Sequence, residues 1–151
     1  MSAALKFTSR ASGPAQIEGH LLRCEDSFVP PLSARVDIGE YARKLHEHAL
    51  TFEAWDGDRL VGLVAMYIDA ASNSAFVSNV SVEPTHAGAG TGSRLLADAI
   101  GFARRREVVR ISLEVSPAAA GAIRLYARHG FLVAHRDHAV LRMQLDFHGN
   151  R

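Results

Sequence analysis

The chain has 151 residues, 48% of them hydrophobic, so it is long enough for one domain with a buried core and too short for two domains of ordinary size. Its 17 basic and 16 acidic residues give a net charge of +1, which excludes the strongly basic surface of a typical nucleic-acid-binding protein. The single cysteine, Cys24, excludes an internal disulfide, and the lack of a long apolar run argues against a signal peptide or membrane span, so we expect a cytoplasmic protein.

The first third of the chain is predicted to be mainly helical. After a weak strand in residues 5–9, apolar residues recur with helical spacing over residues 14–28. The prolines of the VPPLS segment then favour an extended backbone. A second helix is predicted to begin after Asp37, a suitable N-cap residue with Glu40 three positions later, as in a capping box.

From residue 50 onward, strand-like and helix-like segments alternate. Two apolar runs flank the sequence DGD within residues 50–69, which is a strong signal for a β-hairpin. The later elements are predicted as a strand ending at Val82, a helix over residues 91–106, a strand ending at Val115, a helix from Pro117 to His129 and two final strands. The predicted fold class is α/β (α+β), with one mixed sheet in a single domain.

Three glycines, Gly88, Gly90 and Gly92, separate the strand ending at Val82 from the following helix. The first N–H groups of a helix have no intrahelical partner and lie at its positive end, so this position favours phosphate binding. The alternative is a tight connection in which glycine only permits unusual φ angles. A Walker loop is disfavoured because no lysine follows the glycines, and a dinucleotide fingerprint is disfavoured because the loop follows an antiparallel meander.

Two stretches, VEPTHAGAGTGSRLL and LEVSPAAAGAIRLYARHGF, resemble the conserved blocks of the GNAT superfamily of acyl-CoA-dependent N-acyltransferases. The matching residues of the first block are Val82, Pro84, Gly90, Gly92, Leu95 and Leu96. The resemblance covers the chain from about residue 50 to its end. It implies a twisted mixed, mostly antiparallel sheet flanked by helices, in which the strands ending at Val82 and Val115 splay apart to make a slot for pantetheine.

The resemblance also implies acetyl-CoA as the acyl donor and no metal. The residues expected to bind the cofactor are Val80, Ser81, Val82, Gly88, Ala89, Gly90, Thr91, Gly92 and Ser93. Two residues depart from the family pattern: Ala87 replaces a usual Gln or Arg, and Ala119 replaces a frequent Asn. The candidates to compensate for these losses are Ser93, Arg94, Arg124 and Arg128.

Acylation of an amine requires a group that accepts the amine proton and a group that protonates the departing thiolate. The resemblance implies Tyr126 as the thiolate donor, and the alternative is a tyrosine that only packs in the core. Glu114 is the candidate base, because this segment resembles the ribosomal-protein N-terminal alanine acetyltransferases and burial there would raise the pKa of the carboxylate. The alternatives are a surface glutamate paired with an arginine, or a water held by Ser78, Asn79 and Ser81.

The function expected from these features is acetyl transfer to the primary amine of a small molecule. Residues 1–49 are expected to form a helical segment on the substrate side, and residues 50–151 the acyl-CoA-binding core. Two alternatives stay open: a protein N-terminal (alanine-type) acetyltransferase, and a non-catalytic acyl-CoA-binding sensor. Neither nucleic acid nor membrane is expected as a partner, and homodimer formation is left open.

Overall fold

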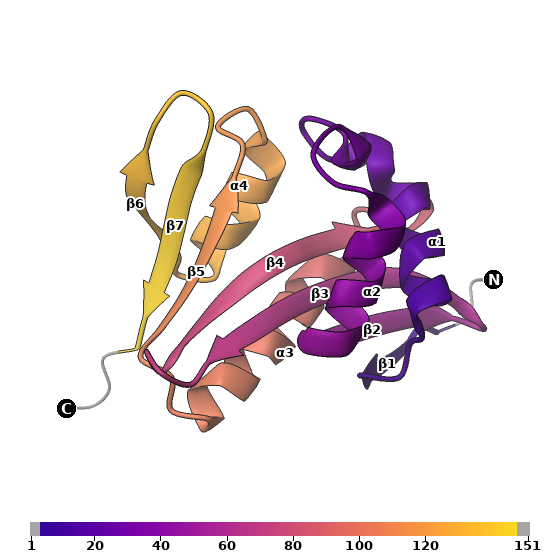
Figure 1. Cartoon of the computed structure of the whole chain (residues 1–151), viewed down its shortest axis with the longest axis horizontal. Helices are drawn as coiled ribbons and strands as arrows, with labels where there is room; N and C mark the ends of the chain where they lie inside the picture. Colours follow the sequence, from indigo (N-terminus) through magenta and orange to yellow (C-terminus); the bar gives the residue numbers. More distant parts are fainter. Residues whose placement is uncertain (1–3, 148–151) are drawn as a thin grey trace.

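A seven-stranded sheet in the order β1-β2-β3-β4-β5-β7-β6 forms the centre of the molecule (Figure 1). The structure is a computed structural model, and it describes residues 4–147. The strands are β1 (Lys6–Ser9), β2 (Leu50–Asp56), β3 (Arg59–Asp69), β4 (Ser74–Val82), β5 (Arg110–Val115), β6 (Leu132–Arg136) and β7 (Leu141–Asp146). All neighbouring strands are antiparallel except β4 and β5, which run parallel. The predicted α/β (α+β) class and mostly antiparallel sheet are therefore confirmed.

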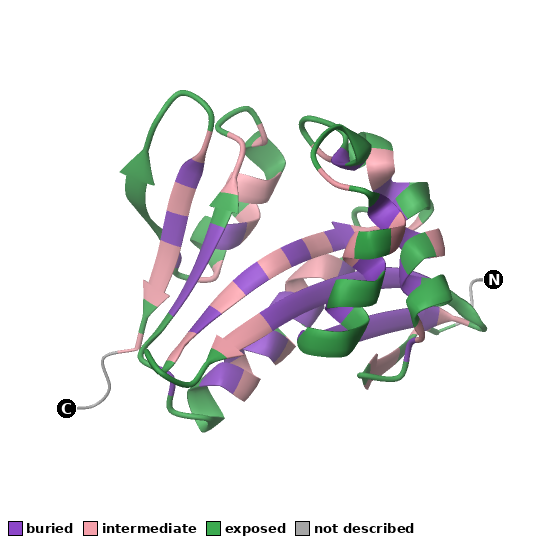
Figure 2. Cartoon of the chain, in the orientation of Figure 1, coloured by how far each residue is buried: buried purple, intermediate pink, exposed green. Residues whose placement is uncertain are grey.

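Helices cover both faces of the sheet and create two apolar cores (Figure 1). The helices are α1 (Pro14–Cys24), α2 (Ile38–His48), α3 (Thr91–Arg105) and α4 (Ala120–Arg128). One core joins α1 and α2 to the sheet, and the other joins α3 and α4 to the opposite face. Strand β3 is buried along most of its length, as expected for a strand covered on both sides (Figure 2). No helix within residues 4–147 is long and apolar enough to cross a bilayer.

Local sequence signals account for several element boundaries. The Asp37 carboxylate accepts a hydrogen bond from the backbone N–H of Glu40 at 2.9 Å, which confirms the predicted N-cap of α2. The β2–β3 hairpin turns at Gly57, where φ is +63°. One boundary was predicted wrongly: α4 begins at Ala120 and not at Pro117, because the chain first forms a turn in which Ala118 N–H donates to Ser116 Oγ.

A β-bulge in β4 shapes the site described below. Ala65 pairs with Asn79 and the next residue of β3 pairs with Val77, so Ser78 is left without a partner in β3. A bulge bends its strand and increases the local twist. Immediately beyond this point β4 turns away from β5, and the two strands diverge widely (Figure 1).

Candidate active site

The parallel pair β4 and β5 is hydrogen-bonded along only part of its length. Pairing extends from Ser74 with Arg110 to Val77 with Leu113, whereas β4 continues to Val82. The last residues of β4 therefore lack a strand neighbour on the β5 side. The predicted splay between the strands ending at Val82 and Val115 is present in the structure.

The splayed part of β4 offers free backbone groups to the gap. The backbone N–H of Glu83 donates to the Val61 carbonyl of β3 at 2.8 Å. Because backbone groups alternate in direction along an antiparallel strand, those of Ser81 also face β3, whereas those of Val80 and Val82 face the gap. Of the three strand residues expected to bind the cofactor, Val80 and Val82 thus present open donors and acceptors, and Ser81 does not.

A cavity of about 290 Å³ occupies the gap. Its walls come from the loop between α1 and α2, the end of β4, the end of β5, α4 and the β6–β7 loop. The lining residues include Phe28, Pro30, Arg35, Ser78, Asn79, Val80, Ser81, Val82, Glu114, Ala119, Ala122 and Tyr126. The opening between the strands allows side chains from both faces of the sheet to share one space. The volume is at the lower end of the range for small-molecule sites.

The glycine loop lies beyond Val82, outside this cavity and exposed to solvent. Gly88 and Gly90 have φ angles of +83° and +84°, and a Cβ built at either position has no atom within 4 Å. Gly92 has another role, since its Cβ would lie 3.4 Å from Val82 Cγ2 and a small residue allows α3 to approach β4. Gly90 is the N-cap of α3, so the first N–H groups of that helix point into an open loop.

Of the other residues predicted to bind the cofactor at the glycine loop, some have side chains that already contact the protein. Ala89 is exposed beside the two glycines. Thr91 is 5% exposed, so its side chain is in the core and only its backbone remains for a ligand. The Ser93 hydroxyl lies 2.8 Å from His129 Nε2 and is therefore already hydrogen-bonded. Arg94 pairs with Asp98 at 3.5 Å and is not directed to the loop.

Tyr126 lines the cavity from the α4 side. It is 8% exposed, and its ring packs against Phe131 with the centroids 6.0 Å apart. Burial raises the pKa of Tyr126 to about 12, so the phenol keeps its proton at neutral pH. The residue therefore combines a core-packed ring with a protonated hydroxyl beside the cavity, and the structure is compatible with the predicted role as proton donor.

Glu114 lines the same cavity from β5, but its surroundings differ from those expected. The side chain is 50% exposed and lies 3.5 Å from Arg142 Nη1 across the β5–β7 pair. The expected desolvation of the carboxylate is thus wrong, because the end of β5 is an open edge of the cavity and not a covered strand. Arg142 also donates to Ser112 Oγ at 3.0 Å, which holds it beside Glu114. Glu114 therefore lies beside the gap as predicted, but its side chain is exposed and paired with Arg142.

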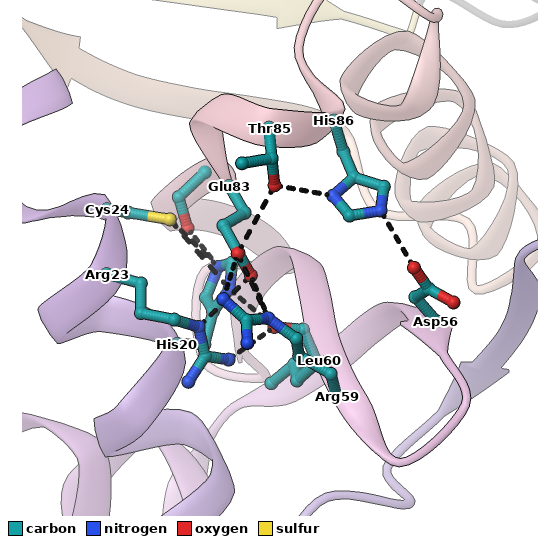
Figure 3. A network of polar contacts seen from close by, with 10 residues as sticks. His20, Arg23, Cys24, Asp56, Arg59, Leu60, Glu83, Thr85 and His86 are labelled. Carbon is teal, nitrogen blue, oxygen red and sulfur yellow. Dashed lines mark hydrogen bonds and ion pairs between the residues drawn. The ribbon is translucent and has the colours of Figure 1, made fainter. Parts of the chain in front are cut away.

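A polar cluster behind the end of β4 could not be predicted from the sequence (Figure 3). Glu83 is 3% exposed, and its carboxylate accepts hydrogen bonds from Arg23 Nε and Arg59 Nε, both at 3.0 Å. The hydrogen bond from Arg59 is the largest cause that lowers the pKa of Glu83, to about 2. His20 of α1 lies in the same cluster and is fully buried. Arg23 and Glu83 are 60 positions apart in sequence, so no local pattern indicates the cluster.

The same cluster continues to the loop that precedes the glycines (Figure 3). His86 Nε2 lies 3.1 Å from Asp56 of the β2–β3 hairpin, and His86 Nδ1 lies 3.0 Å from Thr85 Oγ1. The hairpin and the glycine loop are therefore held together by side chains. Among residues 4–147, no three His, Cys, Asp or Glu side chains gather as metal ligands would.

Comparison with known proteins identifies the family. The model of the Acetyltransferase (GNAT) family matches residues 16–131. The chain belongs to this family. The family resemblance found in the sequence is thereby confirmed.

Three known proteins illustrate the range of its GNAT relatives. Streptothricin acetyltransferase from Streptomyces lavendulae is 36% identical over 85 residues, which cover 56% of this chain and 44% of that protein. The chain thus spans less than half the length of this curated relative. The ribosomal-protein-S18-alanine N-acetyltransferase of Escherichia coli is 21% identical, with a TM-score of 0.77 over 95% of this chain and 94% of that one. The PaiA N-acetyltransferase of Thermoplasma acidophilum, solved with coenzyme A, is 15% identical, with a TM-score of 0.74 over 96% of this chain and 100% of that one. At these identities, the two structural comparisons establish the shared fold.

Proposed function

We propose that this protein transfers an acetyl group from acetyl-CoA to the primary amine of a small molecule, by direct attack of the amine on the thioester. The observation that carries the proposal is the cavity at the β4–β5 splay. There, an open strand edge, a protonated tyrosine and a row of polar side chains face one space. Residues 50–151 hold the donor in this proposal, and residues 1–49 contribute the acceptor side through the loop between α1 and α2.

The residues present fit the donor. Val80 and Val82 offer backbone groups of the kind that an extended chain with amides, such as pantetheine, can pair with in the manner of an added strand. Gly88 and Gly90 leave space where side chains would otherwise cover the first N–H groups of α3, and that helix end favours a pyrophosphate. Ala87 supplies no side-chain donor there, so the backbone carries the anion site. The PaiA relative, which binds coenzyme A, supports this assignment.

The chemistry needs little from the protein besides position and two proton-handling groups. When bound, acetyl-CoA supplies a thioester carbonyl carbon that an amine can attack. Tyr126 holds a proton on its hydroxyl oxygen and is the group that we assign to protonate the departing sulfur. Glu114 is the side chain in the cavity wall that we assign to accept the amine proton, with Arg142 keeping it oriented. The walls exclude bulk water from one side and hold the amine near the carbonyl.

A small-molecule acceptor is favoured over a peptide by the streptothricin acetyltransferase relative, which is the protein of highest sequence identity among the three compared. The alternative is a protein N-terminal (alanine-type) acetyltransferase. The ribosomal-protein-S18-alanine N-acetyltransferase has the same fold, but at 21% identity its substrate is no guide to the substrate of this chain. The sensor alternative is motivated by Ala119, which lines the cavity where many family members have an asparagine.

Release of free CoA thiol from acetyl-CoA, measured against a panel of primary amines and of peptides with N-terminal alanine, tests the proposal. We expect turnover with one class of small amine and an acetylated amine detected by mass spectrometry. Tyr126→Phe run on the same panel controls for hydrolysis that does not need the site. Turnover with peptides alone would replace the proposal by the N-terminal acetyltransferase, and CoA binding with no acceptor at all would replace it by the sensor.

A further inference from the structure

The cavity at the β4–β5 splay has one charged side chain on each side. Arg35 lines it from the loop between α1 and α2, and Glu114 lines it from the end of β5. Figure 1 shows this loop on one side of the gap and the end of β5 on the other. The other lining residues are uncharged. Glu114 already pairs with Arg142, whereas Arg35 forms no ion pair with a carboxylate of residues 4–147.

The backbone at Arg35 is held on both sides. Leu32 is 2% exposed and anchors the loop in the apolar core. The Leu32 carbonyl accepts hydrogen bonds from the N–H groups of Arg35 at 2.9 Å and of Val36 at 3.1 Å. Two residues after Arg35, Asp37 caps α2. The loop therefore fixes the position from which the exposed Arg35 side chain reaches the cavity.

The Arg35 charge acts on the wall that the β4 bulge forms. The Tyr41 hydroxyl of α2 lies 2.6 Å from Ser78 Oγ, and Ser78 lines the cavity. Burial raises the pKa of Tyr41, while its hydrogen bonds to Ser78 and Asn79 and the charge of Arg35 act in the opposite direction. The positive charge is thus on the Ser78 side of the cavity, across from Glu114.

The acyl donor offers no partner for this charge. The pantetheine arm assigned to Val80 and Val82 is uncharged, and the pyrophosphate is assigned to the glycine loop, which lies outside the cavity. Arg35 is therefore available to the acceptor. A planar guanidinium binds a carboxylate through two parallel hydrogen bonds. One guanidinium also balances the single charge of a carboxylate better than the nearly double charge of a phosphate monoester.

We propose that the acceptor is an amine that also carries a carboxylate, of the amino-acid type, and that Arg35 binds this carboxylate and so determines the acceptor class. The opposite charges on the two sides of the cavity complement the two ends of such a molecule, with the carboxylate at Arg35 and the amine at Glu114. The volume of about 290 Å³ restricts the acceptor to a small molecule. A second ammonium group in place of the carboxylate is repelled by Arg35. This inference rests on the proposed function.

A first test compares acceptors that differ only in the carboxylate. The natural α-amino acids, β-alanine and γ-aminobutyrate are each assayed beside the corresponding carboxamide, and leucine also beside isopentylamine, which lacks the group altogether. For the amino acids that the parent acetylates, kcat/KM should exceed that of the carboxamide by roughly 10- to 100-fold, the range expected for hydrogen bonds to a charged group. Carboxamides acetylated as fast as their acids, or turnover only of amines without a carboxylate, would overturn the inference.

A second test removes the guanidinium. Arg35→Gln should lower kcat/KM for the amino acid by roughly 10- to 100-fold and leave that for the carboxamide and the Kd for acetyl-CoA unchanged. Arg35→Lys keeps the charge without the planar fork and should recover part of the loss. Arg43→Gln is the matched control, since Arg43 is an exposed arginine of α2 outside the cavity, and its loss changes the net charge equally. Equal losses for acid and carboxamide in Arg35→Gln, or equal losses in Arg35→Gln and Arg43→Gln, would refute the assignment.

A third test measures the carboxylate site without turnover. N-acetyl derivatives of the same amino acids and of their carboxamides, which are the expected products, are titrated calorimetrically into the protein in the presence of CoA. The parent should bind the acids more tightly than the carboxamides, and Arg35→Gln should bind both alike. This preference without acetylation of any amine would refute the transfer reaction and support the carboxylate site. Equal binding of acid and carboxamide by the parent, or binding of neither, would refute the site itself.

Discussion

Alanine substitutions at two glycines that both have a positive φ distinguish the effect of backbone strain from the effect of a blocked anion site. Gly90 lies in the glycine loop with φ at +84°, and Gly57 lies in the β2–β3 turn with φ at +63°. A Cβ at either position meets no atom within 4 Å. Gly90→Ala and Gly57→Ala therefore both carry the cost of a left-handed alanine, about 1–2 kcal/mol, and neither adds a clash inside the protein.

The two variants should differ only in their affinity for the donor. For a domain of this size, a loss of about 1 kcal/mol lowers Tm by roughly 2–4 °C, so both variants should melt a few degrees below the parent. In Gly90→Ala the new methyl group lies where a phosphate would approach the first N–H groups of α3. Loss of one hydrogen bond to a charged group, about 1.5–3 kcal/mol, should weaken acetyl-CoA binding by roughly 10- to 100-fold.

Isothermal titration of acetyl-CoA into each variant measures this difference directly, with thermal melting recorded on the same samples. Gly57→Ala should bind with the parent Kd. If both variants bind equally well while melting equally early, the glycines serve only the turn, and the phosphate site is not at the start of α3. Alanine is the suitable substitution for this comparison, because a β-branched residue at this φ would strain the loop far more.

Three further predictions address the other groups of the site. Tyr126→Phe keeps the packed ring and should lower turnover by on the order of a hundredfold with acetyl-CoA affinity nearly unchanged; a rate within about twofold of the parent would assign the tyrosine to packing alone. Glu114→Gln should lower kcat/KM for the amine by at least about tenfold with acetyl-CoA affinity nearly unchanged, and a kcat/KM equal to that of the parent would move attention to a water held by β4. Glu83→Gln should lower the free energy of unfolding at pH 7 by about 1–3 kcal/mol in urea titrations. The folded pKa of Glu83, about 2, lies below its ordinary 4.5, so its stabilisation is complete above pH 4.5 and is lost as the pH falls toward 2. The parent should therefore lose more stability than Glu83→Gln over that interval, and parallel losses would contradict the assigned role of the carboxylate.

The sequence predicts those parts of the fold that depend on local chemistry. The Asp37 cap, the turn at Gly57 and the glycine loop each follow from a residue type suited to its backbone conformation. The splay of β4 from β5 was inferred only through the family resemblance. Its physical cause is the bulge at Ser78, which depends on pairing with β3. The alternation of side chains in the β4 sequence does not indicate this bulge.

Only part of the candidate site could be predicted, because the rest depends on contacts between residues far apart in the sequence. Tyr126 and Glu114 line the cavity as the motifs indicate, but the sequence does not indicate that Glu114 pairs with Arg142, 28 positions away. The contact between His20 Nε2 and Ser81 Oγ joins residues 61 positions apart, and the sequence gives no indication that His20 lies behind the site. A buried histidine on an amphipathic helix is the available signal, and only the fold shows what it contacts.

The partial pairing of β4 and β5 divides the molecule along its sequence as well as in space. Everything up to the end of α3 lies on one side of the gap, and β5, α4, β6 and β7 lie on the other (Figure 1). Four residue pairs between β4 and β5, the hydrogen bond between Ser93 and His129, and the apolar core beneath the strands connect the two parts. A chain cut in the loop at Glu107 would therefore yield two contiguous fragments whose reassociation buries the donor site between them. Acetyl-CoA should strengthen that reassociation, which makes this architecture a natural starting point for a split reporter that responds to the acyl donor.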